Sequence, residues 1–302
     1  MTSGNFPLID RDKCTGCRIC ILSCPDLTLT LQKGKALVTG EKCMQCGHCA
    51  ALCPEEAIAV CTPKNKELLF ATFSGRQEWI PYGRGDTAAL VQLMRSRRSC
   101  RNYTEQPVAA AVLEDLVKIG TTAPSGTNSQ HWTFTLIPER AKVVRLGEAI
   151  AAFYHKLNCM AVNPLLRLYT RLFDNDSLGR YYRRYYKTVH QGLAEWDSGG
   201  RDRLFHGAPA VILVGATRQA SCPAEDAALA TQNMLLAAHC MGLGTCLIGF
   251  AVEAIKRDKK LRRLIGLDHA EEIYMAVALG YPREKYRRLT GRKIIGPRYP
   301  AL

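Results

Sequence analysis

The sequence predicts an α+β protein in two parts, a small cysteine-rich part followed by a larger one that mixes helices and strands. Two observations lead to this prediction. Eight of the 14 cysteines form two matching sets within residues 14–53. From residue 88 onward, amphipathic helical patterns alternate with short apolar runs typical of strands. With 302 residues and 47% hydrophobic side chains, the chain is long enough for one large domain or two smaller ones.

Composition and charge narrow the classes of function. No run of 18 or more apolar residues occurs, and the start MTSGNFPLIDRDKC has neither a basic region nor an apolar core. We therefore expect a cytoplasmic protein with no membrane partner. The formal net charge is +14, yet residues 1–62 hold six basic and six acidic side chains, so the excess lies in the remainder. That balance suits anionic ligands or acidic partners. No recognition motif indicates a nucleic acid.

Each cysteine set has the spacing C-x2-C-x2-C-x3-C-P. In the bacterial run of this form, three cysteines bind one cubane iron–sulfur cluster and the fourth binds the other. One [4Fe–4S] cluster is thus expected on Cys14, Cys17, Cys20 and Cys53, and the second on Cys43, Cys46, Cys49 and Cys24. Zinc sites usually show paired C-x2-C knuckles instead. Residues 6–62 resemble a 2[4Fe–4S] ferredoxin, and a core this small needs its metal to fold.

Between the two sets, LTLTLQKGKALVTGEKC predicts a hairpin that turns at Lys33–Gly34. The next stretch, residues 61–90, lacks clean periodicity, but its aromatic side chains suggest that it packs across the second domain. The remaining cysteines have no ligand spacing and are expected to be small buried hydrophobes. They are Cys61, Cys100, Cys159, Cys222, Cys240 and Cys246.

The second part predicts helices over residues 89–99, 110–120 and 225–242, the last ending at a glycine that suits a C-cap. Strands are predicted over residues 131–138, 209–216 and 273–282. No G-x-G-x-x-G follows a strand and no P-loop is present, so the motifs do not indicate a dinucleotide-binding doubly wound fold.

Three short stretches have ligand-binding character. RSRRSCRNY, residues 95–103, offers fixed donors suited to a phosphate or a flavin edge. APSGTNSQHW, residues 123–132, is a polar turn that leads into a strand. GLGTCLIGF, residues 242–250, has glycines that let backbone N–H groups approach a ligand. In this order, and with LGYP and a basic cluster after it, they resemble the nitroreductase family of FMN-binding proteins over roughly residues 90–300.

The resemblance implies a three-layer α+β fold and an intertwined homodimer with FMN at the interface. It divides the chain into a ferredoxin domain at residues 1–62, a linker at 63–89 and an FMN domain at 90–302. Arg97, Arg98, Ser99 and Arg101 are then expected to contact the phosphate, ribityl or ring of FMN. Pro124, Ser125, Asn128 and Gln130 are expected beside the isoalloxazine, with Asn128 the first candidate to bond the ring. Because the family shares its site between subunits, such residues can come from the partner.

The remaining FMN contacts implied by the resemblance lie late in the chain. Leu243, Gly244 and Thr245 are expected to supply backbone donors near the ring. Arg292, with Lys293 beside it, matches the late basic residue that holds the phosphate, although Arg287 and Arg288 lie close by.

Residues 164–206 depart from the family pattern because they are rich in Tyr and Arg. They are either an ordinary amphipathic helical pair or a lid that selects an aromatic or anionic substrate. Side chains that could line such a lid or donate a proton are Tyr181, Tyr182, Tyr185, Tyr186 and His190. No catalytic residue is assigned.

The expected function is that of an iron–sulfur flavoprotein that passes electrons between its clusters and FMN. It would reduce a small electron-poor or conjugated compound, with ferredoxin or NAD(P)H as the donor. Two alternatives stay open: a module that delivers electrons to a protein partner, and a dehalogenating or ene-reducing enzyme on the same fold.

Overall fold

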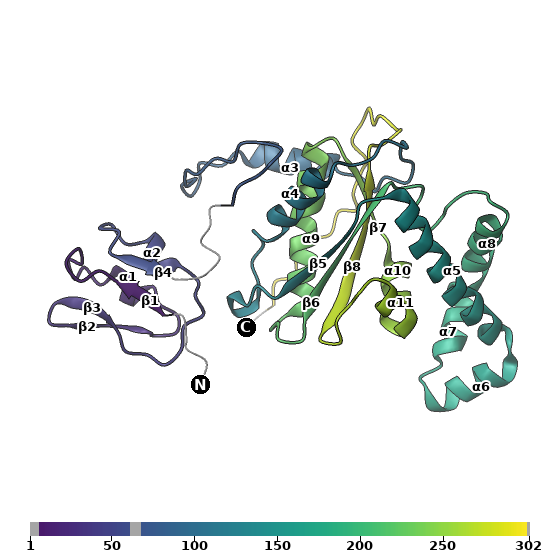
Figure 1. The fold of residues 1–302 in the computed structure, drawn as a ribbon, viewed down its shortest axis with the longest axis horizontal. Coiled ribbons are helices and arrows are strands. Elements are labelled where there is room, and N and C mark those ends of the chain that lie inside the picture. The colour runs from purple at the N-terminus through teal and green to yellow at the C-terminus, as the bar shows by residue number, and fades with distance from the viewer. Residues whose placement is uncertain (1–5, 61–67, 301–302) are drawn as a thin grey trace.

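A computed structural model describes residues 6–60 and 68–300 of the chain. Its N-terminal module is built on two antiparallel strand pairs and two short helices (Figure 1). Strand β1 (Pro7–Ile9) pairs with β4 (Ile58–Val60), and β2 (Leu29–Gln32) pairs with β3 (Lys35–Val38). The helices are α1 (Ile19–Leu22) and α2 (His48–Ala51). Lys33 and Gly34 both have positive φ between β2 and β3, so the predicted hairpin and its turn are confirmed.

The module repeats its backbone conformation every 29 residues. Arg18 and Gly47 precede the two helices with left-handed φ values of 65° and 76°. The sulfur of Cys24 accepts a hydrogen bond from the N–H of Thr28 at 3.3 Å, and the equivalent bond to Cys53 is also 3.3 Å. The repeated cysteine spacing therefore folds into two equivalent turns, as ligation of two similar groups requires.

The larger domain is organised by one antiparallel sheet with the strand order β5-β6-β8-β7. Its strands are β5 (Trp132–Ile137), β6 (Ala210–Thr217), β7 (Gly244–Leu247) and β8 (Glu271–Gly280). Ile212 and Val214 pack in one core, whereas Val211 and Leu213 pack in another on the opposite face. The sheet is thus buried on both sides, because successive strand residues point to opposite faces.

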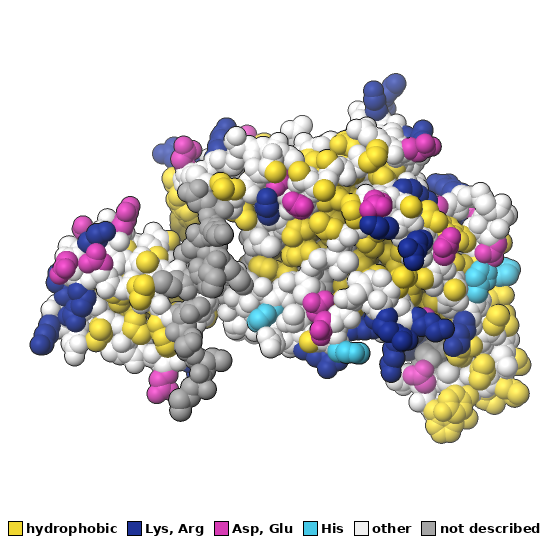
Figure 2. Space-filling view, in the orientation of Figure 1, with side chains coloured by type: hydrophobic (Ala, Val, Ile, Leu, Met, Phe, Trp, Pro, Cys, Tyr) yellow, Lys and Arg dark blue, Asp and Glu magenta, His cyan; other side chains and the backbone are white. Residues whose placement is uncertain are grey.

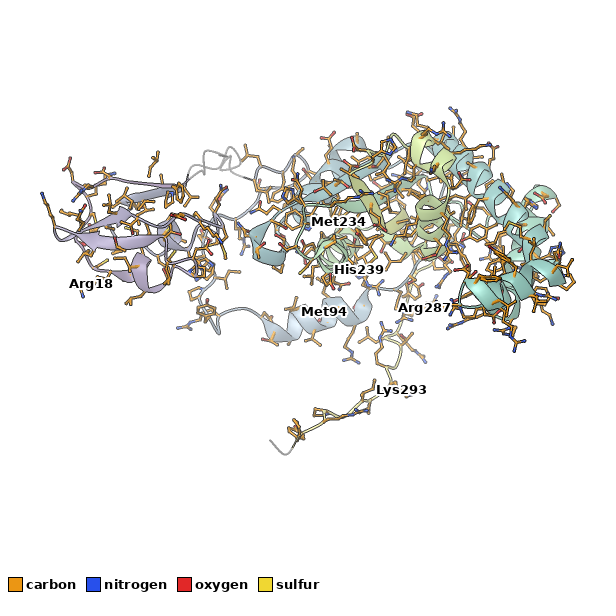
Figure 3. The ribbon with its side chains drawn as sticks, turned by 90° about the horizontal axis from the view of Figure 1, so that it is seen from below. Arg18, Met94, Met234, His239, Arg287 and Lys293 are labelled. Carbon is orange, nitrogen blue, oxygen red and sulfur yellow. The ribbon has the colours of Figure 1, made fainter. Side chains whose placement is uncertain are left out.

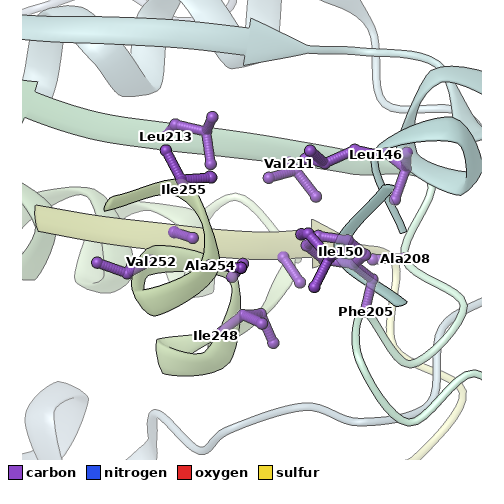
Figure 4. Close-up of a cluster of buried hydrophobic side chains, with 14 of the residues drawn as sticks. Leu146, Ile150, Phe205, Ala208, Val211, Leu213, Ile248, Val252, Ala254 and Ile255 are labelled. Atoms are coloured by element: carbon purple, nitrogen blue, oxygen red, sulfur yellow. The ribbon is translucent and has the colours of Figure 1, made fainter. Parts of the chain in front are cut away.

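Helices cover both faces of this sheet and make three layers (Figure 1). One face carries α4 (Ala110–Gly120) and α9 (Pro223–Cys240). The other carries α5 (Arg140–Val162), α10 (Gly249–Arg257) and α11 (Lys259–Leu264), whose apolar side chains meet Val211 and Leu213 (Figure 4). Gly242 follows α9 with φ +79°, and the N–H of Leu243 bonds the Ala238 carbonyl, so the glycine C-cap is confirmed.

Residues 164–206 contain three helices, α6 (Pro164–Phe173), α7 (Ser177–Arg184) and α8 (Tyr186–Asp197), and not a pair. The extra break lies at Asn175 and Asp176, which both have positive φ. These helices project from the end of α5 (Figure 1). Lys and Arg gather over α10 and α11 (Figure 2), where residues 256–263 include six basic side chains. Among the described residues, no helix is both long and apolar enough to cross a membrane.

The segment that joins the module to the larger domain is tied to α4 by Asp115, whose side chain is fully buried. The N–H of Ala71 donates to its carboxylate at 2.9 Å, and Thr72 donates from both its N–H (2.8 Å) and its hydroxyl (2.7 Å). Lys118 adds an ion pair at 3.0 Å. Further along, helix α3 (Thr87–Ser96) begins at the N-cap Asp86.

The cysteines outside the two sets do not share one environment. Cys100 and Cys246 are buried, as expected, but Cys159, Cys222 and Cys240 are exposed, so the prediction is wrong for these three. Cys61 lies outside the described residues.

Candidate cluster and flavin sites

Each predicted set of cluster ligands surrounds its own small cavity. Cys14, Cys17, Cys20 and Cys53 line one. Cys24, Cys43, Cys46 and Cys49 line the other. In both cavities three cysteines of one run lie with the last cysteine of the other, and this grouping is compatible with the predicted ligand sets. Within residues 6–60 and 68–300, no group of His, Cys, Asp or Glu is placed to hold a single metal ion. A [4Fe–4S] cluster is larger than one ion and is held by four cysteines, so thiols spread around a cavity fit it.

Backbone N–H groups point at the thiol sulfurs. Besides the two repeated bonds, Ala36 N–H donates to Cys14 at 3.4 Å and Gln45 N–H to Cys43 at 3.4 Å. The bond from Ala36 is the largest cause that lowers the pKa of Cys14. Burial, in contrast, raises the pKa of Cys20 and Cys49. Hydrogen bonds to sulfur stabilise the negative charge that a bound cluster places there.

Arginines and a glycine turn from three distant segments form one open cavity of about 480 Å³ in the larger domain. We call it the anion pocket. Its lining includes Arg97 and Arg98, the turn Leu243–Thr245, and Arg287 and Arg288. None of the ion pairs between described residues involves any of these four arginines. Several unpaired guanidinium groups around backbone N–H groups suit a phosphate.

The two sides of the anion pocket are held together by backbone contacts. Ser99 and Thr245 form an isolated parallel β-bridge. The N–H of Cys100 donates a hydrogen bond to the Thr245 carbonyl at 2.9 Å. Gly244 allows this approach, because a Cβ there would lie 2.6 Å from the Cβ of Cys100. Burial, together with Arg292 and Arg98, lowers the pKa of Arg97.

The arginines predicted around FMN take different places. Arg292 influences Arg97 electrostatically but does not line the anion pocket, whereas its neighbours Arg287 and Arg288 do. Burial raises the pKa of the Cys246 thiol, and the charge of Arg101 partly offsets that increase. Arg101 does not line the anion pocket either. Figure 3 shows Arg287 near the end of α3 and Lys293 further out along the C-terminal segment.

The loop of residues 124–130, called the PSGTNSQ loop below, lies elsewhere. Its Gly126 N–H donates to Asp226, near the N-terminus of α9, at 2.8 Å. His239, near the C-terminus of the same helix, lines the anion pocket. At 1.5 Å of rise per residue, these two helix positions are about 20 Å apart.

The sheet gives a second measure of this separation. Trp132, which follows the PSGTNSQ loop, pairs with Ala216, and Ala216 pairs with Glu272 at the start of β8. Gly244 of the anion pocket pairs with Gly280 at the end of β8. At about 3.3 Å per residue, Glu272 and Gly280 are about 26 Å apart. Within one chain, the two predicted sets of FMN residues therefore lie at opposite ends of the sheet.

Within the PSGTNSQ loop, Ser125 accepts a bond from the N–H of Gln130 at 3.0 Å. Asn128 has a partner that the sequence does not reveal. Its side-chain amide donates to the carbonyls of Met44 and Gln45, both at 3.0 Å, and its oxygen accepts from Gln130 at 2.9 Å. Met44 and Gln45 lie between two predicted cluster ligands, Cys43 and Cys46, in what we call the cluster loop. The loop predicted to face the flavin ring thus contacts the cluster module directly.

The tyrosines of residues 164–206 divide into two groups. Tyr181 and Tyr185 line an open cavity of about 870 Å³ together with Tyr154 and Phe250. Burial raises the pKa of Tyr181, and its hydroxyl donates to Asn158 at 2.7 Å. The other group, Tyr182, Tyr186 and His190, forms a separate stack with ring centroids 5.0 and 5.5 Å apart. This stack does not line the cavity.

Comparison with known proteins identifies both domains. The family model described as "Nitroreductase family" matches residues 94–281. The chain belongs to the nitroreductase family. A model described as "4Fe-4S dicluster domain" matches residues 6–54, ahead of the nitroreductase domain. The protein is therefore a nitroreductase-family flavoprotein oxidoreductase with FMN and two [4Fe–4S] clusters as cofactors, and the predicted α+β class and cofactors are confirmed.

Individual relatives of this nitroreductase-family chain are distant. The 4-nitrobenzoate reductase of Pseudomonas putida is 27% identical over 210 residues, which cover 64% of this chain and 85% of that protein. The iodotyrosine deiodinase of Daphnia pulex is 43% identical over 59 residues, 20% of each chain. A crystal structure of a nitroreductase with bound FMN from Bacteroides fragilis has 22% identity and a TM-score of 0.48, covering 68% of this chain and 98% of that one.

Proposed function

We propose that the protein is a homodimeric reductase that passes electrons between its clusters and FMN and uses them to reduce a small electron-poor or conjugated organic compound. The observation that supports this most is the bond from Asn128 to the cluster loop. It joins the part of the chain with the cluster ligands to a loop that the family places at the flavin ring. When bound, FMN supplies the conversion between one-electron and two-electron chemistry.

The proposed dimer follows from the separation between the anion pocket and the PSGTNSQ loop. In a two-fold dimer the anion pocket of one chain can face the PSGTNSQ loop of the other, and two equivalent flavin sites result. Arg97, Arg98 and the Leu243–Thr245 turn would hold the phosphate end. Pro124, Ser125 and Gln130 of the other chain would lie beside the ring.

A small-molecule substrate is supported by the cavity at Tyr181 and Tyr185, which favours a reductase over an electron carrier with a flat, exposed flavin edge. Aromatic rings from α5, α7 and α10 suit an aromatic substrate. Because the Tyr181 hydroxyl donates its hydrogen to Asn158, it would accept a hydrogen bond from a substrate hydroxyl group and so position that group.

The proposal is tested by anaerobic reduction of the purified protein, followed by visible absorbance. NADH, NADPH or a reduced ferredoxin is added, and the flavin band is followed; a nitroaromatic compound is then added to reoxidise the flavin. We expect ferredoxin to bleach the flavin after the clusters and the nitroaromatic to restore it. A preparation without a flavin band, or a reduced flavin that no small electron-poor compound reoxidises, contradicts the proposal.

Reductive dehalogenation is a second candidate, favoured by the 43% identity to an iodotyrosine deiodinase over 59 residues. Iodophenols and nitroaromatics of matched size, offered to the same reduced protein, distinguish the two. Release of iodide with flavin reoxidation supports dehalogenation, whereas reoxidation by the nitroaromatic alone supports nitro reduction.

A further inference from the structure

The contact between Asn128 and the cluster loop indicates which of the two cluster sites lies nearer to the larger domain. Both amide hydrogens of Asn128 are used by the carbonyls of Met44 and Gln45. Its oxygen is fixed by the bond from Gln130, so the orientation of the amide is determined by its partners. The site held by Cys24, Cys43, Cys46 and Cys49 is therefore the one that lies against the larger domain.

The other cluster site lies away from it. Arg18 stands between Cys17 and Cys20, and Figure 3 shows it at the outer end of the N-terminal module, away from the larger domain. Cys17 is exposed. This site is thus placed to meet an external electron donor, and the Cys43-containing site is placed to meet the flavin.

The position of the PSGTNSQ loop then decides which flavin the clusters meet. That loop is about 20 Å, measured along α9, from the anion pocket of its own chain. A flavin held by one chain alone would have to span this distance, so we place the phosphate of a flavin that touches this loop in the anion pocket of the other chain.

We propose that the clusters of each chain exchange electrons with the flavin whose phosphate is held by the partner chain, and that Asn128 is the positioning residue that docks the cluster loop at that flavin. The inference rests on the proposed shared flavin site. Two molecules of reduced ferredoxin, each a one-electron donor, supply two electrons in succession through the clusters. With one proton from solvent they give the two-electron reduced flavin.

Hybrid dimers test this directly. One chain carries Cys46→Ala, which removes a ligand of the inner cluster. The other carries Arg97→Ala and Arg98→Ala, which empty its anion pocket. The two chains are co-expressed with different tags and purified as the mixed dimer. Its only flavin then has its phosphate on the Cys46→Ala chain, and intact clusters lie on the other chain.

Reduced ferredoxin is mixed with this hybrid, and flavin bleaching is timed by stopped-flow absorbance. The Cys46→Ala homodimer provides the rate of any direct route. The inference predicts half the flavin content of wild type and bleaching at the wild-type rate. Bleaching at the rate of the Cys46→Ala homodimer overturns it, because the clusters then serve the flavin of their own anion pocket.

Failures of the two proposals are distinguishable. A monomer by native mass spectrometry overturns the shared site and this inference with it. Equal rates for wild type and the Cys46→Ala homodimer overturn the electron route itself. Slow bleaching in the hybrid alone overturns only the assignment across subunits.

Asn128→Ala provides a second variant in case loss of a cluster ligand unfolds the module. Removing two hydrogen bonds should shift docking of the module by roughly tenfold or more. We expect slower flavin bleaching, unchanged cluster bleaching and a larger radius of gyration by small-angle X-ray scattering. Asn233→Ala is the matched control, because that amide bonds Thr122 within the larger domain. Unchanged scattering and bleaching in Asn128→Ala contradict a positioning role.

Discussion

Replacing Asp115 by asparagine should loosen the segment that joins the two domains. The buried carboxylate accepts three hydrogen bonds from Ala71 and Thr72 and pairs with Lys118. The three bonds from Ala71 and Thr72 all end on Oδ2, so asparagine can keep them by placing its oxygen there, but its amide group then faces the Lys118 ammonium in place of Oδ1. The ion pair is lost, and the remaining bonds are no longer made to a charged acceptor, which makes each of them weaker. We expect the free energy of unfolding to fall by about 2–4 kcal/mol.

The assay is urea unfolding of the anaerobic holoprotein, followed by circular dichroism, together with tryptic cleavage at the exposed Arg76 and Arg84. Glu114→Gln is the control, because it removes the same charge from an exposed position of the same helix. It should change stability by no more than about 0.5 kcal/mol. Equal unfolding midpoints for Asp115→Asn and Glu114→Gln would refute the reasoning.

The low pKa of Asp115 also predicts how the difference in unfolding free energy between wild type and Asp115→Asn changes with pH. Hydrogen bonds from Ala71 and Thr72 outweigh burial and hold the pKa of Asp115 well below its ordinary value. A carboxyl with a lowered folded-state pKa stabilises the fold fully above its unfolded pKa of about 3.9 and loses that contribution as the pH falls. The gap between wild type and Asp115→Asn should therefore be constant from about pH 8 to 5 and narrow below about pH 4. A gap that widens in acid contradicts this assignment.

Three further predictions concern the cofactor sites. Arg97→Met should weaken FMN binding by about 10- to 100-fold, since one charge-assisted hydrogen bond contributes about 1.5–3 kcal/mol; fluorescence titration of the apoprotein checks this, and unchanged affinity contradicts it. Cys46→Ser should lower iron content by about half and remove one cluster signal in electron paramagnetic resonance, and a full complement of iron would contradict the ligand assignment. Gly244→Ala should destabilise the domain by about 1–3 kcal/mol, because its Cβ would lie 2.6 Å from that of Cys100. Gly249→Ala, with no atom within 4 Å, is its control in thermal unfolding.

The grouping of the eight cysteines around two cavities was predictable because its signal is local. Four ligands and a proline stand at fixed spacing, and the spacing alone sets which cysteine crosses to the other run. The hairpin at Lys33–Gly34 was predictable for the same reason. The strands and long helices of the larger domain also follow from short-range periodicity, because one face of each is buried.

The flavin site was only partly predictable, because its candidate residues come from segments that lie far apart in the chain. Sequence similarity led to Arg292, but the fold brings Arg287 and Arg288 to the anion pocket instead. It placed Asn128 at the ring, whereas the structure directs its amide to carbonyls in another domain. Backbone carbonyls leave no signature in a sequence, so this partner could not be found there.

The sequence does contain an indication that residues 164–206 form three helices and not two. The run Asp174-Asn175-Asp176 combines residues that favour turns and left-handed backbone, and the chain breaks there. Tyr and Arg recur at helical spacing on both sides of this run. The sequence therefore suggested that one helix continues across the break.

The central claim, that each flavin site is built from two chains with the inner cluster of one of them beside it, is tested most directly by a crystal structure of the anaerobically prepared holoprotein. We expect the FMN phosphate against Arg97 and Arg98 of one subunit and the isoalloxazine beside the PSGTNSQ loop of the other, with the Cys43–Cys46 cluster loop of that same chain next to it. A flavin whose phosphate and ring are both held by a single chain would contradict the account.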